Sequence, residues 1–153
     1  MPKIYTLQTE QFIPVSLNEA WDFFSSPKNL SKITPDKMNF NIISDTFREK
    51  MYAGQIIQYT VSPLLGLKMH WVTEITKVEE KKMFIDEQRF GPYKFWHHQH
   101  HFNQVDGGVM MTDIINYAIP LGLFGRFLNF LFIGSEVSKI FEYRKKYIDE
   151  NYK

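Results

Sequence analysis

Four of the five histidines lie in one stretch of seven residues, Trp96–Phe102, and they are the side chains best suited to chemistry in this sequence. If the stretch is a β-strand, successive side chains alternate between its two faces. His98 and His100 then share the face that carries the two aromatic ends of the stretch, whereas His97 and His101 share the other. Because the ligands of a metal ion must converge, the four histidines cannot all bind one ion within one subunit.

Asp113 is the carboxylate best placed to meet His98 or His100, because it lies on the strand expected beside theirs. A hydrogen bond to Asp113 would fix the tautomer of a histidine ring. Such a pair would satisfy buried polar atoms or anchor a ligand, or it would act as a general base. Two histidines and a neighbouring carboxylate could also bind a metal ion. We favour the hydrogen-bonded arrangement and expect neither a metal ion nor a cofactor.

The sequence carries few other groups for catalysis. It has no cysteine, which excludes thiolate metal sites and cysteine nucleophiles. It has neither a G-x-S-x-G nucleophile motif nor a glycine-rich phosphate loop. The run Asp86-Glu87-Gln88-Arg89 places one carboxylate on each face of a strand, unlike the paired acids of a glycosidase. These acids suit a solvated strand end, but Asp86 and Gln88 share one face of the strand and would contribute polar groups to a cavity if that face is the inner one.

The composition indicates one domain spanning residues 1–153, with an aromatic content of 16%. The formal charge is only +1, which argues against a nucleic-acid partner. The most apolar stretch, 119–134, contains Pro120 and Arg126 and is shorter than the ~20 apolar residues of a transmembrane helix. Because the N-terminus does not resemble a signal peptide and cysteine is absent, we expect a cytoplasmic protein.

The predicted elements follow from periodicity and turn residues. Alternation predicts a strand at 3–13, and a capping box of Ser16 and Glu19 predicts a helix that ends at Pro27. A second short helix is expected at 28–33. Six further strands are expected at 39–45, 55–62, 67–78, 83–90, 93–103 and 109–119. The segment 123–151 has a helical period and no proline, and predicts a long helix.

These elements predict an α+β fold. Short connections between consecutive strands indicate an antiparallel sheet, because parallel strands need long crossovers. A sheet of about seven strands curls, and its apolar face must be covered. The long C-terminal helix is available for this, with two short helices after the first strand. A curled sheet does not close perfectly on a helix, so we expect a cavity lined by aromatic rings between them.

The order of these elements resembles the helix-grip fold of the SRPBCC superfamily, and specifically its bacterial ligand-binding, cell-division-inhibitor-like branch. The matching residues are Phe12-Ile13-Pro14, Trp21-Asp22-Phe23-Phe24, Pro27, Asn29-Leu30, Ile33-Thr34-Pro35, Trp71-x-Thr73-Glu74-Ile75, Phe84-x-Asp86-Glu87-Gln88, Gly91-Pro92-Tyr93-x-x-Trp96-x-His98-x-His100-x-Phe102, Gly107-Gly108, Asp113, Tyr117-x-x-Pro120 and Phe141-x-Tyr143-Arg144. Val109 departs from the usual Gly-Gly-Thr pattern of that turn. The superfamily includes lipid-transfer START domains, carriers and polyketide cyclases, so the resemblance implies a fold and leaves binding and catalysis both open.

Three functions fit the sequence. We favour binding of a small hydrophobic or amphipathic molecule between the sheet and the C-terminal helix. The expected site residues are Trp71, Gln88, Trp96, His98, His100, Phe102, Asp113, Tyr117 and Arg144. The second function is a cyclase, dehydratase or hydrolase acting on aromatic or polyketide-like substrates, with His98, His100 and Asp113 as acid and base. The third is an interaction protein with a solidly packed core, which a cavity far below ~300 Å³ would favour.

The C-terminal helix carries two further signals. Arg144 falls on its apolar face, where an unpaired charge is costly, so we expect an acidic partner or a ligand. At 100° per residue Phe130 should point inward, on the same face as Ile133, Gly134, Val137, Ile140, Phe141 and Ile148. Leu128, Leu131 and Phe132 should project away from that face. An exposed apolar patch of this kind indicates a homodimer contact, a membrane-surface contact or a mobile lid.

Overall fold

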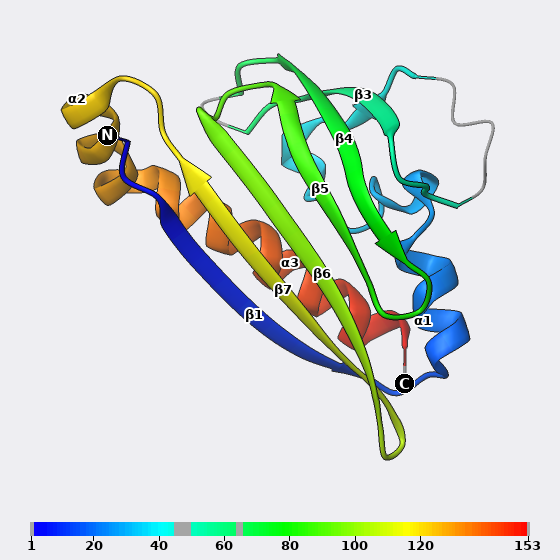
Figure 1. Cartoon of the computed structure of the whole chain (residues 1–153). Coiled ribbons are helices and arrows are strands. Elements are labelled where there is room, and N and C mark those ends of the chain that lie inside the picture. Colours follow the sequence, from blue (N-terminus) through cyan, green and yellow to red (C-terminus); the bar gives the residue numbers. More distant parts are fainter. Residues whose placement is uncertain (1, 45–49, 64–65, 153) are drawn as a thin grey trace.

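The computed structural model describes residues 2–44, 50–63 and 66–152. Its strands form one antiparallel sheet with the order β1-β7-β6-β5-β4-β3-β2 (Figure 1). The strands are β1 (Tyr5–Ile13), β2 (Asn41–Ile42), β3 (Gln55–Val61), β4 (Met69–Glu79), β5 (Met83–Phe90), β6 (Phe95–Val105) and β7 (Gly108–Ala118). This confirms the predicted sheet, although β2 is shorter than expected and Asp45, the end of that predicted strand, lies outside the described residues. Consecutive strands from β2 to β7 are neighbours, and β1 completes the sheet by pairing with β7.

The helix after β1 forms as its capping box predicts. Helix α1 (Leu17–Phe24) begins where Ser16 Oγ accepts from Glu19 N, and the Glu19 carboxylate accepts from Ser16 N. The second short helix predicted at 28–33 is wrong. A single 3₁₀ turn, η1 (Pro27–Asn29), overlaps its start, turns follow over 30–33, and a second 3₁₀ turn, η2 (Asp36–Met38), comes after Pro35.

The long C-terminal helix is present but is not uniform. It consists of α2 (Gly122–Leu128), the π-helical turn η3 (Asn129–Ile133) and α3 (Gly134–Asn151). In the π turn, Gly134 N–H donates to the carbonyl of Asn129, five residues back. A side chain at Gly134 would bring its Cβ to 3.3 Å from that carbonyl oxygen, so glycine favours the close approach.

The π turn changes which residues face the sheet, because it adds one residue to a helical turn. Phe130, predicted to point inward, is 85% exposed, and Asn129 takes the inward position. The prediction that Leu128 and Phe132 project outward is also wrong, since both are half-buried against the aromatic core. Leu131 does project outward.

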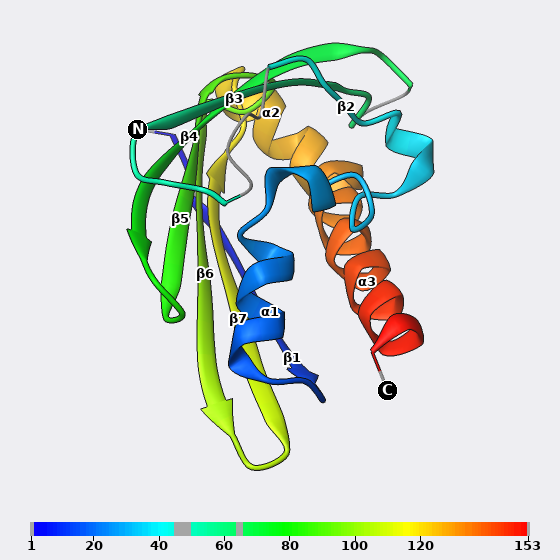
Figure 2. The same ribbon diagram turned by 90° about the vertical axis from the view of Figure 1, so that its right-hand side faces the viewer.

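Helices α1 and α3 lie on the same side of the sheet (Figure 2). Near α1 the core is built from rings such as Trp21, Phe84 and Phe102. Towards α2 a second core contains Trp71, Trp96 and several other aromatic side chains from the sheet. Among the described residues, no helix is long and apolar enough to cross a membrane.

Candidate functional site

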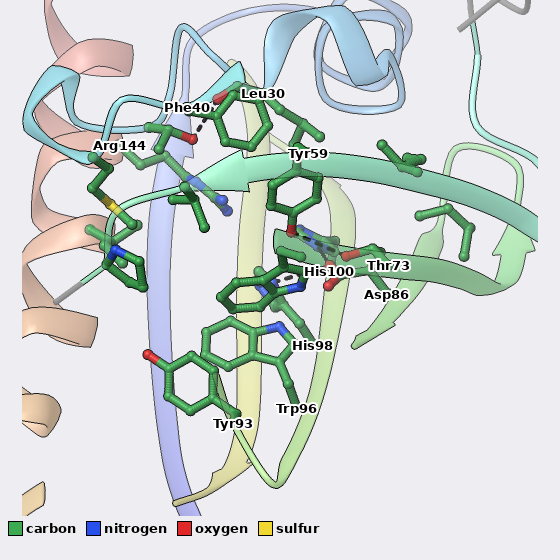
Figure 3. A pocket seen from close by; sticks show the side chains of 18 of the residues that line it. Leu30, Phe40, Tyr59, Thr73, Asp86, Tyr93, Trp96, His98, His100 and Arg144 are labelled. Carbon is green, nitrogen blue, oxygen red and sulfur yellow. Dashed lines mark hydrogen bonds and ion pairs between the residues drawn. The ribbon is translucent and has the colours of Figure 1, made fainter. Parts of the chain in front are cut away.

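A cavity lies between the concave face of the sheet and α3 (Figure 3). Its volume is about 120 Å³. An apolar cavity of ~150 Å³ accommodates benzene, so this space fits a molecule of roughly one ring. Its lining residues come from the sheet, from the segment after α1 and from α3, and are Leu30, Thr34, Met38, Phe40, Met51, Ile57, Tyr59, Val61, Pro63, Trp71, Thr73, Ile75, Phe84, Asp86, Tyr93, Trp96, His98, His100, Ile140, Phe141 and Arg144.

One wall of the cavity consists of stacked and edge-packed aromatic rings. Trp71 meets Trp96 at a centroid distance of 5.4 Å and an interplanar angle of 88°, and Tyr59 stacks on Trp71 at a centroid distance of 5.9 Å. Tyr93 packs on both tryptophans. Burial raises the pKa of Tyr59, whose hydroxyl shares a 3.1 Å hydrogen bond with Thr73. The wall is therefore apolar, rigid and suited to a flat molecule.

The other end of the cavity is polar and is built on three adjacent strands. Residues of β6 alternate as the sequence predicts: Trp96, His98, His100 and Phe102 are all buried. In the register of the sheet, Asp86 on β5 lies opposite His98, and Asp113 on β7 lies opposite His100. The two histidines thus lie between two carboxylates.

The contacts within this polar end are short. His98 Nε2 lies 2.9 Å from Asp113 Oδ1, and His100 Nε2 lies 2.7 Å from Asp86 Oδ2. The two imidazole rings are 3.7 Å apart at their centroids. Arg144, from α3, places Nη1 3.3 Å from both carboxylate oxygens of Asp113. The acidic partner expected for Arg144 is therefore Asp113.

Electrostatics favours the charged forms of the carboxylates. Burial alone would raise the pKa of Asp113, but Arg144 and the two histidines outweigh burial and hold this pKa well below its usual range. The pKa of Asp86 is lowered too, because the effects of His98 and His100 exceed that of burial. Conversely, burial would lower the pKa of His98, but Asp86 and Asp113 raise it.

Five of the residues predicted for the site line the cavity, and four do not. The lining residues are Trp71, Trp96, His98, His100 and Arg144. Asp113 lies behind the histidines and contacts them directly. The other three have structural partners elsewhere. Gln88 accepts from Tyr93 N and donates to Tyr93 O in the β5–β6 turn, Phe102 packs against Trp21, and Tyr117 donates to Asn129 Oδ1.

Two polar groups of the site were not among the expected site residues. Asp86 was placed with Gln88 on one face of its strand, but its run of polar residues also suited a solvated strand end. Its side chain is only 18% exposed and contacts both histidines. Tyr59 was missed as well, although the alternation in 55–62 places it on one face with Ile57 and Val61.

Comparison with known proteins identifies the fold. No family model matches the sequence. No curated protein matches it. Among solved structures, TTHA0849 from Thermus thermophilus superimposes with a TM-score of 0.75 at 14% identity, covering 95% of each chain.

Two further solved structures are similar as well. Ara h 8.0201 gives a TM-score of 0.60 at 15% identity, covering 97% of this chain and 100% of its own. Major latex-like protein 151 from Panax ginseng superimposes with a TM-score of 0.59 at 15% identity. The alignment covers 89% of this chain and 96% of the ginseng protein. The chain therefore has the helix-grip fold of these solved structures.

Proposed function

We propose that the chain binds a small amphipathic molecule of about one ring in the cavity between the sheet and α3. We also infer that it is part of the bacterial ligand-binding branch of the superfamily, on the sequence motifs given above. The small volume argues against a carrier of long lipids. It also lies well below the ~300 Å³ of common ligand sites, so the competing proposal is an interaction protein with a packed core.

The observation that carries the binding proposal is a pair of unsatisfied donors in the cavity wall. Trp71 Nε1 and Arg144 Nε are buried and have no hydrogen-bond partner among the described residues. Both groups carry an N–H, and neither can accept. A buried donor without a partner costs about 1–3 kcal/mol, so such groups need an explanation. A ligand that combines a ring with an acceptor oxygen would stack on the aromatic wall and accept a hydrogen bond from Trp71 Nε1.

The experiment compares two probes of similar shape, acetophenone, which has a carbonyl acceptor, and cumene, which has none. Quenching of tryptophan fluorescence should report binding of both, with acetophenone bound a few-fold to about 10-fold more tightly through one hydrogen bond. Trp71→Phe keeps a ring but removes the donor, and should abolish the preference. Trp21→Phe, in the core near α1, is the matched control and should retain it.

Absence of binding of both probes would contradict the proposal and favour the packed-core alternative. Native mass spectrometry of protein purified from its own host is an independent measurement, since a retained small molecule would appear as a mass difference.

A second function is favoured by one observation. His100 lines the cavity and pairs with Asp86 at 2.7 Å, within reach of a bound molecule. Such a pair can transfer protons as a general acid or base. A cyclase, dehydratase or hydrolase would lose turnover on His100→Gln while retaining ligand binding. Ligand binding without turnover of any aromatic or polyketide-like substrate would contradict this second function.

A further inference from the structure

We propose that Asp86, His98 and His100 form a binding site for one divalent transition-metal ion at the polar end of the cavity. The three residues each offer one ligand atom, and these atoms lie within 4.8 Å of one another. Two imidazole nitrogens and one carboxylate oxygen form a donor set typical of zinc and of non-haem iron, with further positions open. Those open positions would face the cavity that the three residues line.

The first argument is a count of hydrogens. Each histidine places both ring nitrogens near a carboxylate. Besides the two hydrogen bonds above, His98 Nδ1 lies 3.3 Å from Asp86 Oδ2, and His100 Nδ1 lies 2.9 Å from Asp113 Oδ1. A neutral imidazole has only one N–H, so four contacts compete for two hydrogens. His100 Nδ1 indeed has no well-directed hydrogen bond among the described residues, although it is buried.

Either two additional protons or one cation would resolve this shortage. Two protons would create two imidazolium rings with centroids 3.7 Å apart in a buried site. Like charges at that distance disfavour each other. A single divalent ion between Asp86 and the histidines supplies the same positive charge without stacking two cations.

Asp113 and Arg144 suit the role of supporting groups. A metal-bound histidine usually donates its other ring N–H to a carboxylate, which fixes the tautomer and the ring orientation. Asp113 Oδ1 lies 2.9 Å from the second nitrogen of each histidine, and Arg144 holds the carboxylate in place. The inference concerns the cavity of the proposed function but does not require that a small molecule binds there. It departs from the expectation of no metal that the sequence supports, because Asp86 takes part.

Zinc chloride is the probe for the test, added to tag-free protein that has been treated with a chelator. Isothermal titration calorimetry should show one ion per chain. Removal of a supporting group alone costs 10–100-fold in metal affinity, so loss of a ligand in Asp86→Asn or His100→Gln should weaken binding by about 100-fold or more. Asp86→Glu retains a carboxylate and should bind more tightly than Asp86→Asn. Cobalt gives a second readout, since its visible absorption bands report the coordination geometry.

The matched control is the double variant His97→Gln with His101→Gln, which removes the histidines on the outer face of the same strand. It should bind zinc like the unmodified chain. Binding lost in this control instead would assign the metal to the protein surface and overturn the proposal. Failure to bind zinc at a 1:1 ratio would overturn it too. The acetophenone titration on metal-free protein separates this failure from a failure of the ligand-binding proposal, and circular dichroism verifies the fold of each variant.

A second inference rests on a different part of the molecule. We define the α2 surface as six large apolar side chains, each more than half exposed: Leu121, Leu123, Phe124, Phe127, Phe130 and Leu131. These six side chains point away from the core because of the winding of α2 and the π turn. An exposed apolar patch of this density marks an interaction surface.

We infer that the α2 surface binds a membrane surface rich in anionic lipid. Lys3, Lys94 and Arg126 line a depression next to Leu123, and among the described residues no carboxylate forms an ion pair with them. Residues 114–135 contain no Asp or Glu. Aromatic and leucine side chains bordered by cations are typical of segments that lie in the membrane interface. A self-association through this surface would instead bring the cations of two copies together.

Co-sedimentation with vesicles tests this inference. Protein should pellet with phosphatidylcholine vesicles that contain phosphatidylserine, and much less with phosphatidylcholine alone or in high salt, where charge attraction is screened. The double variant Phe124→Glu with Phe127→Glu should remain in the supernatant. Ile56→Glu, at an exposed apolar position on β3, is the control and should pellet normally. Equal sedimentation of both variants would overturn the inference, as would a dimer that dissociates on Phe124→Glu with Phe127→Glu without vesicle binding.

Discussion

The two faces of β6 carry the same residue type in two environments. His98 and His100 face α3, and their side chains are 4% and 6% exposed. His97 faces outward with a side chain 23% exposed, and its nearest carboxylate, that of Glu87, belongs to a group of surface ion pairs with Arg89. His101 Nε2 forms a 3.0 Å hydrogen bond with Gln99 Oε1. Histidine content alone therefore does not define a site; what defines it is burial together with carboxylates on both neighbouring strands.

The inner and outer carboxylates differ in the same way. Glu87 follows Asp86 directly, yet its contacts with His97 and Arg89 are partly solvated. Asp86 and Asp113 are enclosed by the sheet and α3, where an ion loses its water and needs partners. Adjacent acids on β5 therefore differ in environment because they lie on opposite faces of the strand: Glu87 is at the surface, and Asp86 lines the cavity. The following substitutions test this contrast, beginning with the largest expected effect.

Replacement of Asp113 should cost the most stability. Asp113→Asn leaves Arg144 buried without its carboxylate partner and leaves the two histidines with Asp86 alone, and loss of one partner of a buried ion pair typically costs about 3 kcal/mol or more. Urea denaturation should show this decrease in the free energy of unfolding. Glu87→Gln on the outer face is the comparison and should change it by less than about 0.5 kcal/mol. Similar effects of both substitutions would remove the distinction between the faces.

Truncation of single histidines should give an intermediate effect. His98→Ala removes two polar contacts and leaves space beside Phe141, so we expect a loss of about 1–3 kcal/mol. His97→Ala should be nearly neutral. Thermal and urea unfolding of the two variants measure the difference, and a loss in His97→Ala that matches His98→Ala would contradict it.

The smallest effect is expected for the coupling between His97 and Glu87. A partly exposed ion pair contributes roughly 0–1 kcal/mol. A double-mutant cycle with His97→Ala and Glu87→Ala should therefore give a coupling free energy within this range, and it should decrease further with added salt. A coupling of several kcal/mol would mean that the outer face is organised as tightly as the inner one.

The sheet and the face of each β6 residue could be predicted from the sequence, because strands alternate with a fixed period of two. The same alternation predicted that Asp113 lies beside the inner histidines. Alternation also placed Asp86 and Gln88 on one face of their strand, but the polar run Asp86-Glu87-Gln88-Arg89 suited a solvated strand end equally well. Only the packing of α3 against the sheet decides which of its acids is enclosed, and this is a long-range property.

The orientation of the first half of the C-terminal helix could not be predicted. Extrapolation at 100° per residue places Phe130 inward, and it fails because one residue more occupies the turn at Asn129–Ile133. Two features accompany this turn. Tyr117 donates a hydrogen bond to Asn129, and Gly134 has no side chain to crowd the Asn129 carbonyl. Tyr117 is distant in sequence from Gly134, so no local pattern reveals the turn.

The extra residue in η3 also divides the C-terminal segment into two stretches that can change independently. Substitutions before it alter the outward-facing apolar residues without moving Phe141 or Arg144, whose positions are set from the other side of the turn. Deleting one residue within 129–133 would restore regular winding and rotate everything upstream by about 100°. A chain without this insertion would therefore present a different exterior around α2 while Phe141 and Arg144 kept their positions.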